Sequence, residues 1–361
     1  MDRKPTFTTE EKSMAEIKAD MTDSQLSPQE IIIGMALSYL VSRCLHVAAE
    51  LGIADLLKDG PRSTEDLARA TGAHEMSLHR VLRTLAAHGV FAEESPSGFQ
   101  LTPAAALLRT GTPDSLRDAV RMVGDLAGDG SWWKAVGSLR DSVLTGEPGF
   151  NQIHGRGFFE YLIEHPEAGA WFDRGLANFA APENAAIVAA YSFAKFKRVV
   201  DVGGGQGGLL AEILKADQSL MGTPFDLPQV VRNPAYLTLA GVANRCEIIG
   251  GDFFADIPRG GDAYILKRIL HDWGDQQCLE ILRRCREAMD ETDRILVVDA
   301  VLPEGNRPHP GKVMDILMMV LCEGRERKEQ EVRELYARAG SQLTKVIPTQ
   351  SVLSIVERQP S

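Results

Sequence analysis

The sequence predicts an α/β protein in which a mostly helical winged-helix domain precedes a Rossmann-like, doubly wound sheet. The first half of its 361 residues, to about Lys195, carries apolar residues at helical spacing. Within that half, residues 61–109 follow the order of two helices and a hairpin that is typical of a winged helix. From about Arg198, short apolar runs alternate with helical stretches, as strands and crossover helices do in a doubly wound sheet.

These changes of pattern divide the chain into four segments. The first is polar and is expected to be a flexible tail. The third is helical and rich in aromatic residues, some of which suit the lining of a pocket for a flat molecule. Together with the winged helix and the sheet, the predicted segments are 1–29, 30–110, 111–196 and 197–361.

The winged-helix segment is expected to begin with a long helix and to end with a hairpin. Apolar residues at helical spacing predict the first helix over Ile31–Leu57. Ser63 suits the N-cap of a second helix, and a further helix is expected over Glu75–His88. The short runs 89–91 and 98–101 are expected to pair as the hairpin.

The second half predicts seven strands, because seven short apolar runs are each bounded by turn residues. Helices are expected between them, for example over Gly207–Ala216 and Asp275–Met289. The predicted strands are Arg198–Val202, Met221–Leu227, Cys246–Ile249, Asp262–Leu266, Arg294–Val301, Leu343–Pro348 and Ser351–Val356.

Charge and composition narrow the expected partners. The formal net charge of −11 repels nucleic acid on average. The helix over Glu75–His88 offers Arg80 and Arg83, but its leucines and valine are better suited to packing than to reading bases. A protein–protein module is therefore favoured, and a DNA-binding regulator stays as the non-enzyme alternative. No apolar run approaches the roughly 20 residues that span a bilayer, so no membrane partner is expected.

The five cysteines predict a reduced, cytoplasmic protein. Their number is odd and none forms a CxxC pair, so neither a disulfide framework nor a zinc site is expected. The sequence also shows no compact cluster of carboxylates, and no metal is expected.

The strongest chemical signal is the glycine-rich turn after the first strand of the sheet. Gly203, Gly205 and Gly208 fit GxGxxG, so a dinucleotide is one candidate ligand. Asp201, however, precedes the first glycine, and its charge would repel a pyrophosphate. An acid there suits a ligand with a cationic amino group, so the pattern that also includes Gly207 favours S-adenosylmethionine as the cofactor.

Two further acidic positions fit an adenosine-containing ligand. Asp226 ends the second strand, where a carboxylate can accept both ribose hydroxyls. The alternative is a helix N-cap. After the third strand, Asp252 can accept the exocyclic amine of adenine while Phe253 packs on the base. The alternative there is a plain turn with a buried aromatic pair.

A histidine follows the fourth strand, in the crevice where the ligand is expected. His271 titrates near neutral pH and suits a general base. Asp299 ends the fifth strand, and Glu326 lies in a turn further along the chain. Either can accept the other ring N–H of the histidine and fix its tautomer; the alternative for both is a salt bridge with a nearby arginine.

In this order the motifs resemble those of the small-molecule O-methyltransferases of the caffeic acid and hydroxyindole type, with their bacterial relatives in phenazine and polyketide tailoring. The resemblance covers about residues 30–358. Its motifs are the glycine-rich turn, Phe-Asp-Leu-Pro at 225–228, Gly-Asp-Phe-Phe at 251–254, Leu-His-Asp-Trp at 270–273 and Gly-Arg-Glu-Arg at 324–327. One departure is Asp299, where the plant enzymes have the longer glutamate.

The resemblance implies a dimerisation role for the winged helix and a position for Lys267 alongside the cofactor. It implies that S-adenosylmethionine methylates a hydroxyl of a small, aromatic secondary metabolite, with His271 as the base. Methylation at nitrogen or carbon, or non-methyl chemistry on the same scaffold, is the alternative within the fold. The residues expected to line the substrate pocket are Phe158, Phe172, Leu176, Phe179, Met318 and Met319.

Overall fold

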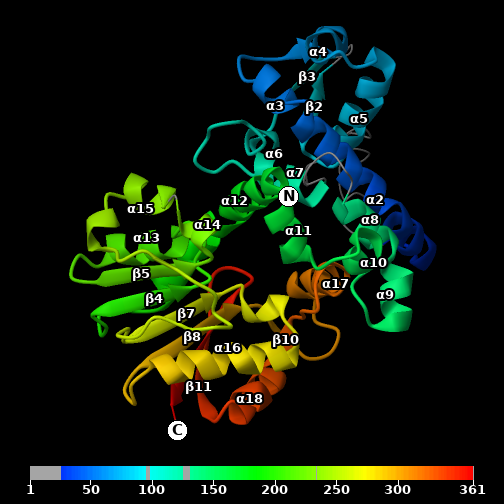
Figure 1. Ribbon diagram of the computed structural model, residues 1–361. Helices are drawn as coiled ribbons and strands as arrows, with labels where there is room; N and C mark the ends of the chain where they lie inside the picture. The colour runs from blue at the N-terminus through cyan, green and yellow to red at the C-terminus, as the bar shows by residue number, and fades with distance from the viewer. Residues whose placement is uncertain (1–25, 95–97, 125–130, 233, 361) are drawn as a thin grey trace, which may run out of the picture.

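The computed structural model describes residues 26–94, 98–124, 131–232 and 234–360. Its N-terminal helices lie apart from the large sheet, and the long helix α12 runs between these two parts (Figure 1). The predicted order of a helical first half and a doubly wound second half is therefore confirmed. The tail predicted for residues 1–29 lies largely outside the described residues, but its last two residues open the first described helix.

The N-terminal part is a winged helix. Ser63 caps its α4 as expected, since the hydroxyl accepts a hydrogen bond from the backbone N–H of Asp66 at 3.1 Å. Its three short strands form an antiparallel sheet in the order β1-β3-β2. The elements are α2 (Pro28–Glu50), α3 (Ile53–Leu56), β1 (Arg62–Ser63), α4 (Thr64–Thr71), α5 (Glu75–Ala87), β2 (Phe91–Glu94), β3 (Gly98–Leu101) and α6 (Pro103–Ala106).

The long helix expected over Ile31–Leu57 is two helices. Gly52 adopts a left-handed φ of 66°, which ends the hydrogen-bonding pattern of α2 and starts α3. Residues 28–40 of α2 are all exposed, and most of them are apolar. By length and composition alone α2 could cross a membrane, so the expectation that no segment approaches that length is wrong.

A bundle of helices links the winged helix to the sheet. Its aromatic residues pack on one another, for example Phe150 edge-on to Phe158 and Tyr161, with ring centroids 5.2 and 5.3 Å apart. Helix α17 from the second half of the chain packs on α8 and α10 of this bundle. The helices are α7 (Arg117–Gly124), α8 (Ser131–Gly137), α9 (Leu139–Thr145), α10 (Gly149–His154), α11 (Phe158–Glu164), α12 (Pro166–Ala190) and α17 (Gly311–Leu321).

The sheet has seven strands in the order β11-β12-β8-β7-β4-β5-β6. The five strands β8, β7, β4, β5 and β6 are parallel, while β12 and β11 are antiparallel additions at one edge. From β4 the chain adds β5 and β6 on one side, and it then crosses back to add β7 and β8 on the other side. The strands are β4 (Arg198–Val202), β5 (Met221–Asp226), β6 (Ile249–Gly250), β7 (Ala263–Lys267), β8 (Arg294–Asp299), β11 (Ser341–Pro348) and β12 (Ser354–Pro360).

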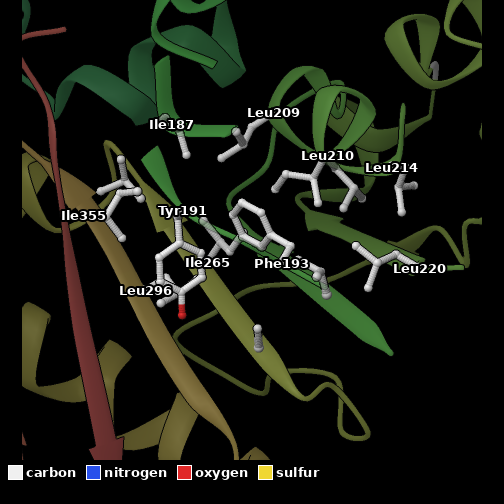
Figure 2. Close-up of a cluster of buried hydrophobic side chains, with 14 of the residues drawn as sticks. Ile187, Tyr191, Phe193, Leu209, Leu210, Leu214, Leu220, Ile265, Leu296 and Ile355 are labelled. Atoms are coloured by element: carbon white, nitrogen blue, oxygen red, sulfur yellow. The ribbon is translucent and has the colours of Figure 1, made fainter. Parts of the chain in front are cut away.

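Alternate residues of each strand enter two different cores, as the pleat requires. Val199 and Ile265 pack under α13 (Gly208–Ala216), with the end of α12, in the core shown in Figure 2. Their neighbours Val200 and Leu266 face the opposite side. That side is covered by α16 (Asp275–Ala288) and α18 (Glu329–Arg338).

Three strand predictions differ from the structure by more than one or two residues at an end. The run Cys246–Ile249 makes one bridge to β5 at Cys246, and only Ile249–Gly250 forms a strand. The run Arg294–Val301 breaks after Asp299, and Val301–Leu302 (β9) pairs instead with Arg327–Lys328 (β10). Strand β12 begins three residues later than expected, because the hydroxyls of Thr349 and Ser351 hold a turn before it.

Candidate active site

The expected site residues meet at the carboxyl ends of the parallel strands. Between β4 and β7 the chain reverses the direction in which it adds strands, and open α/β sheets bind ligands at such a switch point. The glycine-rich turn follows β4, and the segment 268–273 follows β7. These two segments touch, since a Cβ atom at Gly203 would clash with the side chain of Ile269.

Asp201 is the buried acid at the base of the glycine-rich turn. Only 2% of the residue is exposed, and one of its carboxylate oxygens, Oδ2, has no hydrogen-bond partner among the described residues. Burial raises the pKa of Asp201 to about 7, while the nearby Lys267 opposes that rise. A buried carboxylate with an unsatisfied oxygen suits a cationic group of a ligand. This supports the expected contact with the amino-acid end of S-adenosylmethionine.

Asp226, the acid expected to bind ribose, ends β5 and is held by two backbone hydrogen bonds. Asp226 Oδ2 accepts a hydrogen bond from the backbone N–H of Gly205 at 2.9 Å, and Oδ1 accepts one from Leu227 at 2.7 Å. The carboxylate therefore bridges the glycine-rich turn and the strand end. Burial raises the pKa of Asp226, and these two backbone bonds work against that rise.

The adenine pair is arranged as a turn with an aromatic wall. Asp252 is exposed, and its Oδ1 accepts the backbone N–H of Phe254 at 2.9 Å, which leaves its other oxygen for a ligand. Phe253 lies near the glycine-rich turn and packs on Phe254 and edge-on to Trp273. The turn and the expected adenine contact are compatible, because they use different oxygens of Asp252.

His271 is buried, and each of its ring nitrogens lies beside a carboxylate. Its Nδ1 lies 2.9 Å from Glu326 Oε1, and its Nε2 lies 3.3 Å from Asp272 Oδ1. Because an ionised carboxylate only accepts hydrogen bonds, the neutral form of the ring carries its proton on Nδ1, and Nε2 is then the basic nitrogen. Burial disfavours the charged ring, but Asp272, Glu326 and Asp299 outweigh that effect and raise the pKa of His271 to about 9.

Glu326 is held in turn by the side chain of Asp315 and by the close packing of its own turn. Its N–H donates to Asp315 at 2.9 Å, and a Cβ at Gly324 would clash with the carbonyl oxygen of His271. The buried Arg327 donates to the carbonyls of Leu270 and Trp273 at 2.9 and 3.0 Å. The turn 324–327 is thus fastened to the histidine segment from two sides.

Asp299 lies near His271 but makes no hydrogen bond with it. The two side chains line a cavity of about 20 Å³ together with Glu326, which is room for about one water molecule. Asp299 Oδ1 and Glu326 Oε2 have no hydrogen-bond partner among the described residues. Of the two acids expected to orient the ring, Glu326 contacts it directly and Asp299 acts only through its charge.

Three of the expected pocket residues share one face of α12. Phe172, Leu176 and Phe179 lie at helical spacing and continue to Glu183, which contacts Lys267 at the end of β7. Phe158 on α11 packs edge-on to Phe172, with ring centroids 5.3 Å apart. On α17, Met318 is buried and contacts Cys322. Burial raises the pKa of the Cys322 thiol, and the charge of Asp272 raises it further. Met319 is half-buried on the same helix, with no side-chain contact to the site among the described residues.

The sequence analysis missed a buried polar cluster around Lys267. The ammonium of Lys267 donates to Asn184 at 2.9 Å and contacts Glu183 at 3.0 Å, and Arg268 contacts the same glutamate. Burial lowers the pKa of Lys267, and Glu183 counteracts this. Asp272 and Trp273, both within the quoted histidine motif, were not singled out either. Their adjacency to His271 was the available signal, whereas none marked Glu183.

An acid before the glycines, an acid at the end of the second strand and a buried histidine after the fourth are the features expected of an S-adenosylmethionine-dependent methyltransferase, and the comparisons with known proteins show that class. A model described as the O-methyltransferase domain matches residues 136–342, and one described as the O-methyltransferase dimerisation domain matches residues 33–111. The chain belongs to the O-methyltransferase family.

Relatives span nearly the whole chain. The chain is 45% identical to phenazine O-methyltransferase PhzM of Lysobacter antibioticus, over 91% of this chain and 96% of that one. It is 33% identical to phenazine-1-carboxylate N-methyltransferase of Pseudomonas aeruginosa, over 91% and 96%. A solved O-methyltransferase from neocarzinostatin biosynthesis, NcsB1, in complex with S-adenosylmethionine and 2-hydroxy-5-methyl naphthoic acid, matches with a TM-score of 0.76 at 34% identity, over 89% and 96%.

Proposed function

We propose that this methyltransferase acts on a hydroxyl group of a small, fused aromatic molecule, with His271 as the general base. The observation that carries the proposal is the buried ring of His271, whose Nδ1 is held by Glu326, so that Nε2 of the neutral ring can take a substrate proton. The phenazine and naphthoic acid named for two relatives support the substrate class.

Each residue expected to hold the cofactor has a separate role in this proposal. Asp201 and Asp226 would hold the amino-acid and ribose ends of S-adenosylmethionine, and Phe253 with Asp252 would hold its adenine. Lys267 lies alongside Asp201 and balances its charge. When bound, the cofactor supplies an electrophilic sulfonium methyl group.

The aromatic wall positions the acceptor, and His271 receives its proton. Phe172, Leu176 and Phe179 present an apolar face to a flat ring. The hydroxyl must lose its proton as the oxygen forms the new C–O bond, and Nε2 is the acceptor at hand. Glu326 then stabilises the imidazolium, because its carboxylate already accepts from Nδ1.

Oxygen is favoured over nitrogen because of the base. A phenolic O–H has a proton to give up, whereas an aromatic ring nitrogen attacks with its lone pair and needs no base. One relative is nevertheless named as an N-methyltransferase. Methylation of a ring nitrogen is therefore the second candidate.

The test compares two acceptors and one variant. Purified protein is given S-adenosylmethionine with 1-hydroxyphenazine or with phenazine-1-carboxylate, and the product is identified by mass spectrometry and NMR. We expect a methyl ether from the first acceptor and a loss of about 10²–10⁴-fold in kcat with His271→Ala. Binding of S-adenosylhomocysteine is expected to survive that substitution, which controls for folding. Ring N-methylation with a fully active His271→Ala enzyme would overturn the proposal.

We also propose that the chain forms a homodimer through α2. A helix that is apolar on all sides is stable in water only when it is covered. The exposed residues include Ile32, Ile33 and Met35, which are 66%, 60% and 71% exposed. The match to a dimerisation domain from residue 33 onward supports a second copy as the cover.

A further inference from the structure

Helix α12 buries two polar side chains in succession against the end of β7. Glu183 is 6% exposed and Asn184 is 4% exposed. A buried carboxylate is costly unless cations satisfy it. Arg268 does so with two nitrogens, since Nε donates to Oε2 at 3.1 Å and Nη2 contacts Oε1. The pair joins the helix that carries the substrate wall to the segment that carries His271.

The backbone of Arg268 is itself unusual. Its φ is 55°, and within the described ranges it is the only residue other than glycine with a positive φ. Such a conformation persists only where the surroundings enforce it, and it is common at active sites. The N–H of Arg268 donates to Val298 at 3.0 Å, next to Asp299, and its side chain is held by Glu183. These contacts fix the point where the chain leaves β7 toward His271.

The guanidinium of Arg268 acts on the acids around the base. Its positive charge lowers the pKa of Asp272 and of Asp299, both of which burial raises to about 6. Glu326 and Asp299 act back on Arg268 and, with Glu183, hold its pKa above the usual value although burial opposes this. The titratable and charged groups that face this cluster are Asp272 and His271 after β7, Asp299 on β8, Glu326 and Cys322 after α17, Asp315 on α17, Glu183 on α12, and Lys267 on β7.

We propose that Arg268 is a positioning residue that puts a fixed positive charge among the acids beside His271, and that Glu183 holds Arg268 where it can do so. The inference rests on the proposed role of His271 as the base. It differs from a merely structural salt bridge in one respect: removing the cation must change the protonation of the cluster as well as its stability.

The direction in which the pH profile moves separates the proposed role of Arg268 from that of a merely structural salt bridge. Removing a positive charge raises the pKa of every acid and base near it, so Arg268→Gln is expected to move the acidic limb of the pH profile to higher pH. Glu183→Gln removes a negative charge and through space alone would move that limb to lower pH. If Glu183 acts by holding Arg268, its loss moves the limb in the same direction as Arg268→Gln.

The experiment measures kcat/KM against pH with 1-hydroxyphenazine, and in parallel the pKa of His271 from ¹⁵N-histidine NMR on the substrate-free protein. We expect Arg268→Gln and Glu183→Gln to raise the limb by about one pH unit, which is about tenfold in kcat/KM at pH 7. Arg268→Lys keeps the charge and is expected to restore the limb. The control is Glu247→Gln, which breaks the 2.6 Å pair with Arg198 at the opposite edge of the sheet.

An unmoved limb and an unmoved His271 resonance in both glutamine variants would overturn the inference, whatever happens to kcat. Thermal melting and binding of S-adenosylhomocysteine show whether each variant is folded, and Glu183→Gln carries the test if Arg268→Gln is not. Should His271→Ala be fully active, the proposed base has failed first, and that result is separate from the behaviour of Arg268.

Discussion

The proton on His271 is the feature at the residue scale that most constrains the reaction. The pKa of about 9 means that the free ring is charged below that pH, and only the neutral ring is a base. Two pH units below it, roughly one ring in a hundred is neutral. We therefore expect kcat/KM for 1-hydroxyphenazine to rise about tenfold per pH unit between pH 7 and 8.5 and to level off near pH 9. A flat profile across this range would contradict the raised pKa.

Asp299 tests the cause of that raised pKa. Its negative charge raises the pKa of His271 without a direct hydrogen bond. Asp299→Asn removes the charge and keeps the size of the side chain, so the acidic limb is expected to move to lower pH, opposite to Arg268→Gln. The same profile measured with Asp293→Asn, an acid at the far end of β8, serves as the control. A shift to higher pH would show that Asp299 acts by some route other than its charge.

Asp201 makes a second prediction at this scale. Its pKa of about 7 lies above the usual range, so the carboxylate is lost as pH falls through 7. If the anion holds the ammonium of the cofactor, the affinity for S-adenosylhomocysteine should weaken below pH 7 and reach a plateau above about pH 8. Titration calorimetry from pH 5.5 to 8.5 measures this. Asp201→Asn is expected to weaken binding and to abolish the pH dependence, and a variant that keeps that dependence would assign it to another group.

At the scale of elements, α12 combines two proposed roles on one face. Phe172, Leu176 and Phe179 follow helical spacing toward Glu183, so one helix would carry both the proposed substrate wall and the contact with the segment that leads to His271. Phe179→Ala is expected to raise the KM for 1-hydroxyphenazine about three- to tenfold through lost apolar contact. The affinity for S-adenosylhomocysteine should not change. Leu144→Ala, a leucine 66% exposed on α9, is the matched control, and equal effects from both would remove Phe179 from the wall.

The elements also show what the sequence could predict. Asp226 and His271 could be singled out because Asp226 ends its strand and His271 lies shortly after its strand, and local order alone puts strand ends at one edge of the sheet. Glu183 was not found because its partner Arg268 is 85 residues away, and a glutamate after a proline in a helix also fits an exposed face. The break between β8 and β9 was missed for a similar reason, since the pairing of β9 with β10 is nonlocal.

At the scale of the whole molecule, the exposed apolar half of α2 is the surface that a partner is expected to cover. Residues 28–40 of α2 are all exposed, while its second half packs on α5 and α7 within the same chain. A partner copy that covers the first half would bury isoleucine and methionine side chains at about 25 cal/mol per Å² of apolar surface. The same helix passes the length and composition test for crossing a membrane, so a second copy and a lipid surface are the two covers to compare.

Charged substitutions on α2 decide between them. We expect Ile32→Glu with Met35→Glu to convert the dimer into a monomer by light scattering, because each buried carboxylate would lose its hydration at the interface. Neither the wild type nor the variant should float with phosphatidylcholine and phosphatidylglycerol vesicles. Glu30→Gln, on the same exposed stretch, controls for a change of surface charge. Flotation of the wild type that the double substitution abolishes would instead assign α2 to a membrane, and an unchanged dimer would place the interface elsewhere on the chain.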